Sequence, residues 1–210
     1  METPARWLAL GDSYTIGEGV PHDTRWPELV AARLRASGTR VAPPRIVATT
    51  GWTCEDLLAG MEADGVWPRR ESYALVSLLI GVNDQFRGRA PAQGRFAECL
   101  ERAVALTGGE PARVLWIAFP DWGVTPFAHG RDRAAIAREV DAWNAHERSL
   151  AEAAGVHTAS VTELSRAHSA KPRFLAADGL HPGAAAYAAW AEYLAPFAER
   201  ALGATAVARS

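Results

Sequence analysis

Long hydrophobic runs, clusters of basic residues and cysteines are all scarce in this chain. None of its apolar stretches approaches the ~20 residues that a helix needs to cross a bilayer. Its 22 Lys and Arg nearly balance its 24 Asp and Glu, and their scatter argues against a nucleic-acid surface or a polybasic membrane patch. Cys54 and Cys99 are the two cysteines, too few for a disulfide framework or a Cys-rich zinc site, and they suit a reducing compartment.

The N-terminus also lacks the features of a signal peptide. Residues 1–4 carry no basic side chain, and the apolar segment that follows is only as long as a strand. We therefore expect a cytoplasmic protein. The chain has 210 residues, 49% of them hydrophobic, and shows no internal repeat or linker. These features predict a single catalytic domain over residues 1–210.

What the sequence does contain is an alternation of short apolar segments with longer amphipathic ones. Strands are predicted at residues 6–10, 45–49, 73–80, 113–119 and 156–160. Helices are predicted at residues 27–36, 53–61 with Thr53 as the cap, 96–106, 132–154 and 182–202. This alternation predicts an α/β fold, a three-layer α/β/α sandwich of flavodoxin-like type with a mostly parallel five-stranded sheet. The order of the strands cannot be deduced from the pattern.

Polar residues and glycines follow the predicted strands, where open α/β sheets bind their ligands. The segments read GDSY at 11–14, GWT at 51–53, GVND at 81–84 and PDW at 120–122, and DGLHP at 178–182 precedes the last helix. A serine, a histidine, an aspartate and donors of hydrogen bonds are the groups that acyl transfer requires.

The spacing of Asp178 and His181 suits a catalytic base. A serine hydroxyl such as that of Ser13 becomes a useful nucleophile when a base takes its proton, and an unperturbed imidazole titrates near pH 6.5, close to working conditions. Because Asp178 lies only three residues before His181, its carboxylate can hold the Nδ1 proton and leave Nε2 to face Ser13.

Taken in chain order, these blocks resemble those of the SGNH hydrolases, also called GDSL esterases and lipases. The matching residues span positions 11–182. The resemblance implies that Ser13 is the nucleophile, that His181 is the base and that Asp178 orients it. It also implies an oxyanion hole formed by Ser13, Gly51 and Asn83.

The same resemblance implies a serine hydrolase that cleaves small-molecule carboxylic esters or thioesters through an acyl-enzyme, without a metal or a cofactor. Small or short-chain acyl groups are favoured because the domain has no obvious lid insertion. Trp52, Phe86 and Trp122 are the aromatic residues expected to line the substrate pocket. Tyr14 departs from the pattern by standing where the family usually has leucine, which concerns the packing behind the nucleophile.

Several alternatives remain open from the sequence. A carbohydrate O-deacetylase would use the same mechanism. A metal-dependent phosphoesterase could use Asp12, Asn83, Asp84 and His181, although the paired histidine motifs typical of such sites are missing. A binding module on the same fold would keep the pocket and lack turnover. The sequence does not determine the oligomeric state.

Overall fold

Five parallel strands form one sheet in the order β2-β1-β3-β4-β5 in the computed structural model, which describes residues 3–68, 71–168 and 171–207. Residues 1 and 2, on which the N-terminal prediction partly rests, lie outside this description. The strands are β1 (Trp7–Gly11), β2 (Arg45–Ala48), β3 (Leu75–Leu79), β4 (Val114–Ala118) and β5 (His157–Ser160). The predicted α/β fold is confirmed, and every strand pair is parallel.

The direction in which successive strands are added to the sheet reverses between β1 and β3. From β1 it moves outward to β2, then returns past β1 to β3 and continues through β4 to β5. Gly11, the last residue of β1, is paired with Leu79 of β3 and with Ala48 of β2, so the carboxyl ends of the three strands meet at one edge. In this strand order the crevice between β1 and β3 is where ligands bind.

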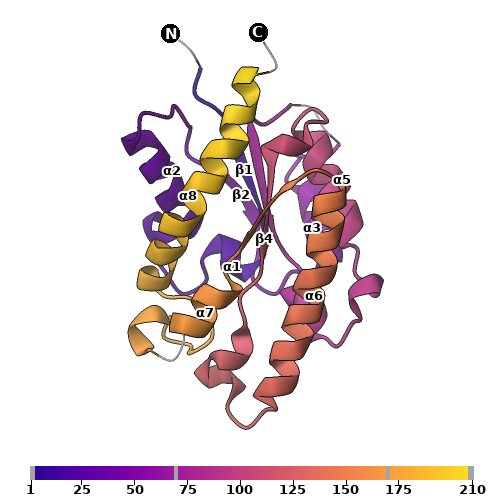
Figure 1. Ribbon diagram of the computed structural model, residues 1–210, viewed down its shortest axis with the longest axis vertical. Helices are drawn as coiled ribbons and strands as arrows, with labels where there is room; N and C mark the ends of the chain where they lie inside the picture. The colour runs from indigo at the N-terminus through magenta and orange to yellow at the C-terminus, as the bar shows by residue number, and fades with distance from the viewer. Residues whose placement is uncertain (1–2, 69–70, 169–170, 208–210) are drawn as a thin grey trace.

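Helices cover both faces of the sheet (Figure 1). The helices on one side are α2 (Trp26–Ala36) and α8 (Ala184–Val207), and those on the other are α3 (Cys54–Ala63), α5 (Phe96–Leu106) and α6 (Arg133–Ala153). Successive residues of a strand point to opposite faces, so Trp7 joins the core under α2 and α8 while Leu8 joins the core under α3 and α5. Every residue of β1, β3 and β4 is buried, as expected for central parallel strands.

Most predicted helices are present with ends shifted by a few residues. Thr53 caps α3 as predicted, in a reciprocal capping box with Asp56, and Asp132 caps α6. The last helix begins at Ala184 and continues past Pro196 to Val207. Within residues 3–68, 71–168 and 171–207, no helix has both the length and the apolar composition required to cross a bilayer.

Three short helices were not predicted: α1 (Ser13–Ile16), α4 (Val82–Phe86) and α7 (Thr162–His168). Each is too short to show a helical repeat of apolar residues. The first two follow β1 and β3 directly, and they carry the polar residues singled out above. These short helices therefore determine how the candidate site residues are presented at the edge of the sheet.

Candidate active site

Ser13 lies at the sharp turn that follows β1. Asp12 precedes it and caps α1, because its Oδ1 accepts a hydrogen bond of 2.9 Å from the backbone N–H of Tyr14. This cap fixes the direction in which the chain leaves the strand. Ser13 is therefore the first helical residue after β1, and it lines a cavity at the edge of the sheet.

Asp178 and His181 form a direct pair in the loop that precedes α8. The distance from His181 Nδ1 to Asp178 Oδ2 is 2.6 Å, and Asp178 Oδ1 accepts the backbone N–H groups of Leu180 and His181 at 2.9 and 3.0 Å. Burial alone would raise the pKa of the Asp178 carboxyl. The hydrogen bonds from the His181 ring and from the two backbone N–H groups outweigh it, so this pKa lies below its ordinary value. An ionised Asp178 accepts the Nδ1 proton and leaves Nε2 as the basic nitrogen.

One cavity of about 170 Å³ brings these segments together. Its lining residues are Ser13, Tyr14, Thr50, Gly51, Val82, Asn83, Phe86, Trp122, Phe127, Leu180 and His181. Among the described residues, no hydrogen bond joins the Ser13 hydroxyl to the His181 ring. Such contacts are often long without substrate and shorten in the reacting complex.

Asn83 and Gly51 line the cavity from the segments that follow β3 and β2. Asn83 Nδ2 donates a hydrogen bond of 2.9 Å to the Trp52 carbonyl, which uses one of its two N–H groups and leaves the other for a ligand. Gly51 has a φ of +84°, and no heavy atom lies within 4 Å of the position that a Cβ would take. Open space and a left-handed backbone both favour glycine where a substrate must approach the main chain.

Aromatic side chains form one wall of the cavity. Phe86 and Trp122 are part of it, as predicted for a substrate pocket, with their ring centroids 5.2 Å apart. Phe127 lies 6.2 Å from both and completes the wall. Phe127 lies in segment 120–131 after β4, which we considered from the sequence as a possible wall of the pocket. The guanidinium of Arg131 covers all three rings at 5.4 to 5.5 Å.

Trp52 was also predicted to line the pocket, but the structure does not place it in the lining of this cavity. Its ring lies on α3 over Gly60, where an added Cβ would come within 2.2 Å of it. The missing side chain at Gly60 leaves room for the indole, and Trp52 packs against the core beneath α3. Only its carbonyl contributes to the site, as the acceptor for Asn83.

Comparison with known proteins agrees with this arrangement. A model of the GDSL-like Lipase/Acylhydrolase family matches residues 9–189. The chain belongs to this family. As a GDSL hydrolase with SGNH-type structural neighbours, it is an ester-hydrolysing enzyme. No curated protein matches it.

Several solved structures share this fold. TesA is 25% identical with a TM-score of 0.70, over 93% of this chain and 99% of TesA. The lipase/acylhydrolase from Enterococcus faecalis is 21% identical with a TM-score of 0.67, over 91% of this chain and 94% of the other. The esterase EstA from Pseudoalteromonas sp., in a structure inhibited by monoethylphosphonate, is 16% identical with a TM-score of 0.66, over 95% and 99%.

In this GDSL hydrolase the buried Asp84 connects α4, which carries Asn83, with the segment that runs from Gly51 into α3. Asp84 Oδ2 accepts the backbone N–H of Cys54 at 2.8 Å, and its Oδ1 pairs with Arg89 at 2.8 Å. Asp84 thereby ties the start of α3 to α4. The phosphoesterase alternative treats Asp12 and Asp84 as metal ligands, but each holds a backbone N–H instead. Among the described residues, no group of three or more His, Cys, Asp and Glu side chains is arranged to hold a metal ion.

Replacing Asp12 with asparagine is expected to remove part of the pH dependence of stability. Burial, together with the charge of the neighbouring Asp84, raises the pKa of the Asp12 carboxyl from 3.8 to about 7. Between these two values the folded protein keeps a proton that the unfolded chain releases, so stability falls as the pH rises through this range. Asparagine retains an oxygen for the Tyr14 N–H and cannot ionise.

The measurement is the free energy of unfolding in urea at about pH 5, where the folded protein keeps the Asp12 proton and the unfolded chain has released it, and at about pH 8, above the folded pKa of about 7. The loss of stability between the two pH values should be clearly smaller in Asp12→Asn than in the wild type. The Glu147 carboxyl, whose pKa burial also raises, remains in both proteins and leaves both with some pH dependence. Equal pH dependence in the two proteins would contradict a buried, titrating Asp12.

Proposed function

We propose that this GDSL hydrolase is a serine hydrolase that cleaves carboxylic esters or thioesters with small acyl groups through an acyl-enzyme. The observation that carries the proposal is the Asp178–His181 pair at 2.6 Å, which opens onto the same cavity as Ser13 at the β1–β3 crevice. Ser13 is the proposed nucleophile, His181 the base, and Asp178 the group that orients it.

The proposed reaction has two halves. As the Ser13 hydroxyl attacks the carbonyl carbon, His181 Nε2 takes its proton, and the carbonyl oxygen becomes an oxyanion. The bond to the leaving oxygen or sulfur then breaks, the leaving group receives the proton from His181, and the acyl group stays on Ser13. A water molecule, deprotonated by His181, attacks this ester and releases the acid together with the free Ser13 hydroxyl.

The oxyanion is proposed to bind the backbone N–H groups of Ser13 and Gly51 and the side-chain amide of Asn83. Each comes from a segment following a different strand, and all three residues line the cavity. Asp84 and the Trp52 carbonyl hold two of these segments before substrate arrives. Donors held in position in this way stabilise the charge without rearranging during the reaction.

Small acyl groups are favoured by the size and lining of the cavity. A volume of about 170 Å³ is below the ~300–1,000 Å³ typical of pockets for drug-sized ligands. The wall of Phe86, Trp122 and Phe127 is apolar, which suits a short hydrocarbon group. This preference belongs to the proposal and separates it from a lipase for long chains.

Asn83→Ala is expected to lower kcat by about 10²- to 10³-fold, the usual effect of losing one oxyanion donor. KM should change little, because the lost hydrogen bond strengthens only as charge develops. The measurement is steady-state hydrolysis of p-nitrophenyl acetate, with a thermal melt to show that the variant is folded. Asn83→Asp is the matched variant, since it keeps the shape and removes both N–H donors. A folded Asn83→Ala enzyme within three-fold of wild type would exclude Asn83 from the hole.

The test of the whole proposal is labelling with a fluorophosphonate, followed by peptide mapping. The proposal predicts loss of activity together with an adduct on Ser13, and EstA, a structural neighbour, is a precedent for inhibition by a phosphonate. Labelled and unlabelled enzyme are then assayed on acetate esters, a short acyl thioester and an acetylated sugar. A faster rate on the sugar would favour the O-deacetylase. Activity that resists the reagent and disappears with EDTA would indicate a metal-dependent hydrolase and overturn the proposal.

A further inference from the structure

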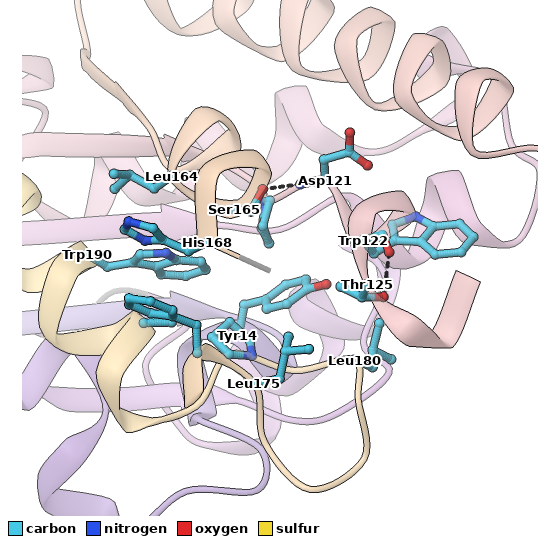
Figure 2. A pocket seen from close by; sticks show the side chains of 14 residues that line it. Tyr14, Asp121, Trp122, Thr125, Leu164, Ser165, His168, Leu175, Leu180 and Trp190 are labelled. Carbon is cyan, nitrogen blue, oxygen red and sulfur yellow. Dashed lines mark hydrogen bonds between the residues drawn. The ribbon is translucent and has the colours of Figure 1, made fainter. Parts of the chain in front are cut away.

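A second, much smaller cavity adjoins the candidate active site and shares lining residues with it; Figure 2 shows the side chains around this second cavity. Its volume of about 10 Å³ is room for roughly one water molecule. The residues around it belong to α7, to the start of α8, to the 3-10 turn Pro172–Phe174 and to the segment after β4. The lining residues that bear on its connection to the active site are Tyr14, Trp122, Leu175, Leu180 and Trp190.

Much of this lining is apolar, and key polar groups in it are already paired. Ser165 accepts the backbone N–H of Asp121 at 2.9 Å and donates to the Thr162 carbonyl. The Asp121 carboxylate binds Arg166 and the backbone N–H of Gly123. The His168 ring, also in the lining, differs because its Nδ1 atom is buried without a hydrogen-bond partner. A hydrocarbon group entering this space would leave the Ser165 and Asp121 atoms hydrogen-bonded, which lowers the cost of burying it there.

Tyr14 separates this second cavity from the catalytic one. Three residues line both cavities: Tyr14, Trp122 and Leu180. The Tyr14 ring is 3% exposed, with its centroid 5.7 Å from the His181 ring on one side and 6.3 Å from the Trp190 ring on the other. Figure 2 shows it projecting into the lining of the second cavity. Ser13 and Tyr14 line the same cavity and Tyr14 also lines the second, so an acyl chain on Ser13 that extends towards the second cavity meets the Tyr14 ring.

We propose that Tyr14 sets the upper limit of acyl-chain length by closing the catalytic cavity against the space behind it. The inference rests on the proposed function, because it concerns the acyl group carried by Ser13. Leucine at this position lacks the outer half of the ring and the hydroxyl. The smaller side chain joins the two cavities and lets a longer chain continue towards Leu175 and Trp190.

The expected effect of Tyr14→Leu is a shift in substrate preference towards longer chains. Each methylene that gains a buried place raises kcat/KM by about three- to four-fold. Two such methylenes raise the ratio of kcat/KM for the octanoate to that for the acetate by about ten-fold. The ratio is the informative quantity, since a change beside Ser13 can also alter the absolute rate.

The experiment measures kcat/KM for p-nitrophenyl esters from acetate to dodecanoate. Tyr14→Phe keeps the ring and is expected to keep the wild-type ratio. Leu164→Ala enlarges the second cavity away from the separating ring and is also expected to keep it. The double variant Tyr14→Leu/Leu164→Ala should accept longer chains than Tyr14→Leu alone, because only there is the added space connected to the active site.

An octanoate-to-acetate ratio for folded Tyr14→Leu within two-fold of wild type would overturn the inference, as would an equal shift in Tyr14→Phe. If Tyr14→Leu does not fold, Leu180→Ala thins the same separating wall, and the same two outcomes apply to it. A wild-type enzyme that hydrolyses none of the esters would count against the proposed function instead. The two failures are thus distinguishable in one set of assays.

Discussion

Ser13→Ala is expected to lower kcat for p-nitrophenyl acetate by about 10⁶-fold, the effect of removing the nucleophile from other serine triads. Without the hydroxyl no acyl-enzyme can form, and the remaining oxyanion donors act only on direct attack by water. Ser13 is buried at the start of α1 and loses only its hydroxyl in this variant. We therefore expect a folded protein, to be checked by its thermal melt.

Ser149→Ala is the matched control, since Ser149 is an exposed serine on α6 whose hydroxyl bonds only to the carbonyl of His146. It should keep wild-type activity and label normally with the fluorophosphonate, while Ser13→Ala should give no adduct. Retention of more than about one-hundredth of the activity by Ser13→Ala, far above the residual rate of other triads that lack their serine, would mean that another group is the nucleophile.

Asp178→Asn is expected to lower kcat by about 10⁴-fold, as the equivalent change does in other serine triads. Asparagine at 2.6 Å from His181 Nδ1 presents either an N–H donor or a weaker acceptor. The imidazole then carries its proton on Nε2, where it can no longer accept the proton of Ser13. Substrate binding should be affected much less, because Asp178 is not among the residues that line the catalytic cavity.

The measurement is kcat and KM across the neutral and alkaline pH range. A loss of kcat that persists over this whole range indicates the wrong tautomer of His181, because a change in the charge of the imidazole would make the loss depend on pH. Asp23→Asn is the control, an exposed aspartate in the 3-10 turn His22–Thr24, and should behave as wild type. An Asp178→Asn enzyme within ten-fold of wild-type kcat would show that the pair does not orient the base.

Much of the fold was predictable because its signals are local. The segment predicted as the strand 73–80 contains β3, and its lack of polar alternation correctly indicated burial on both faces. The helix predicted over 96–106 is α5 with both ends as expected. Caps at Thr53 and Asp132 marked the starts of α3 and α6. In each case the information lies within a few neighbouring residues.

The parts that could not be predicted depend on contacts between distant segments. Helix α7 has only seven residues and one buried threonine and serine, which is too little for a periodic pattern. Trp52 follows a strand in the sequence as a pocket residue would. Its ring packs on α3 because Gly60 has no side chain to occupy that place. Tyr14 lines both cavities because α7 and α8, which are far along the chain, pack near it.

The sequence by itself determined the kind of chemistry on offer and the alternation that builds a parallel sheet. It also placed Asp178 within reach of His181, because residues only three positions apart stay close together in space. Only the tertiary structure decided that β1 and β3 lie side by side and that Ser13, Asn83 and His181 open onto one cavity. Strand order follows from the burial of whole faces against helices that are remote in the chain, and no local spacing encodes it.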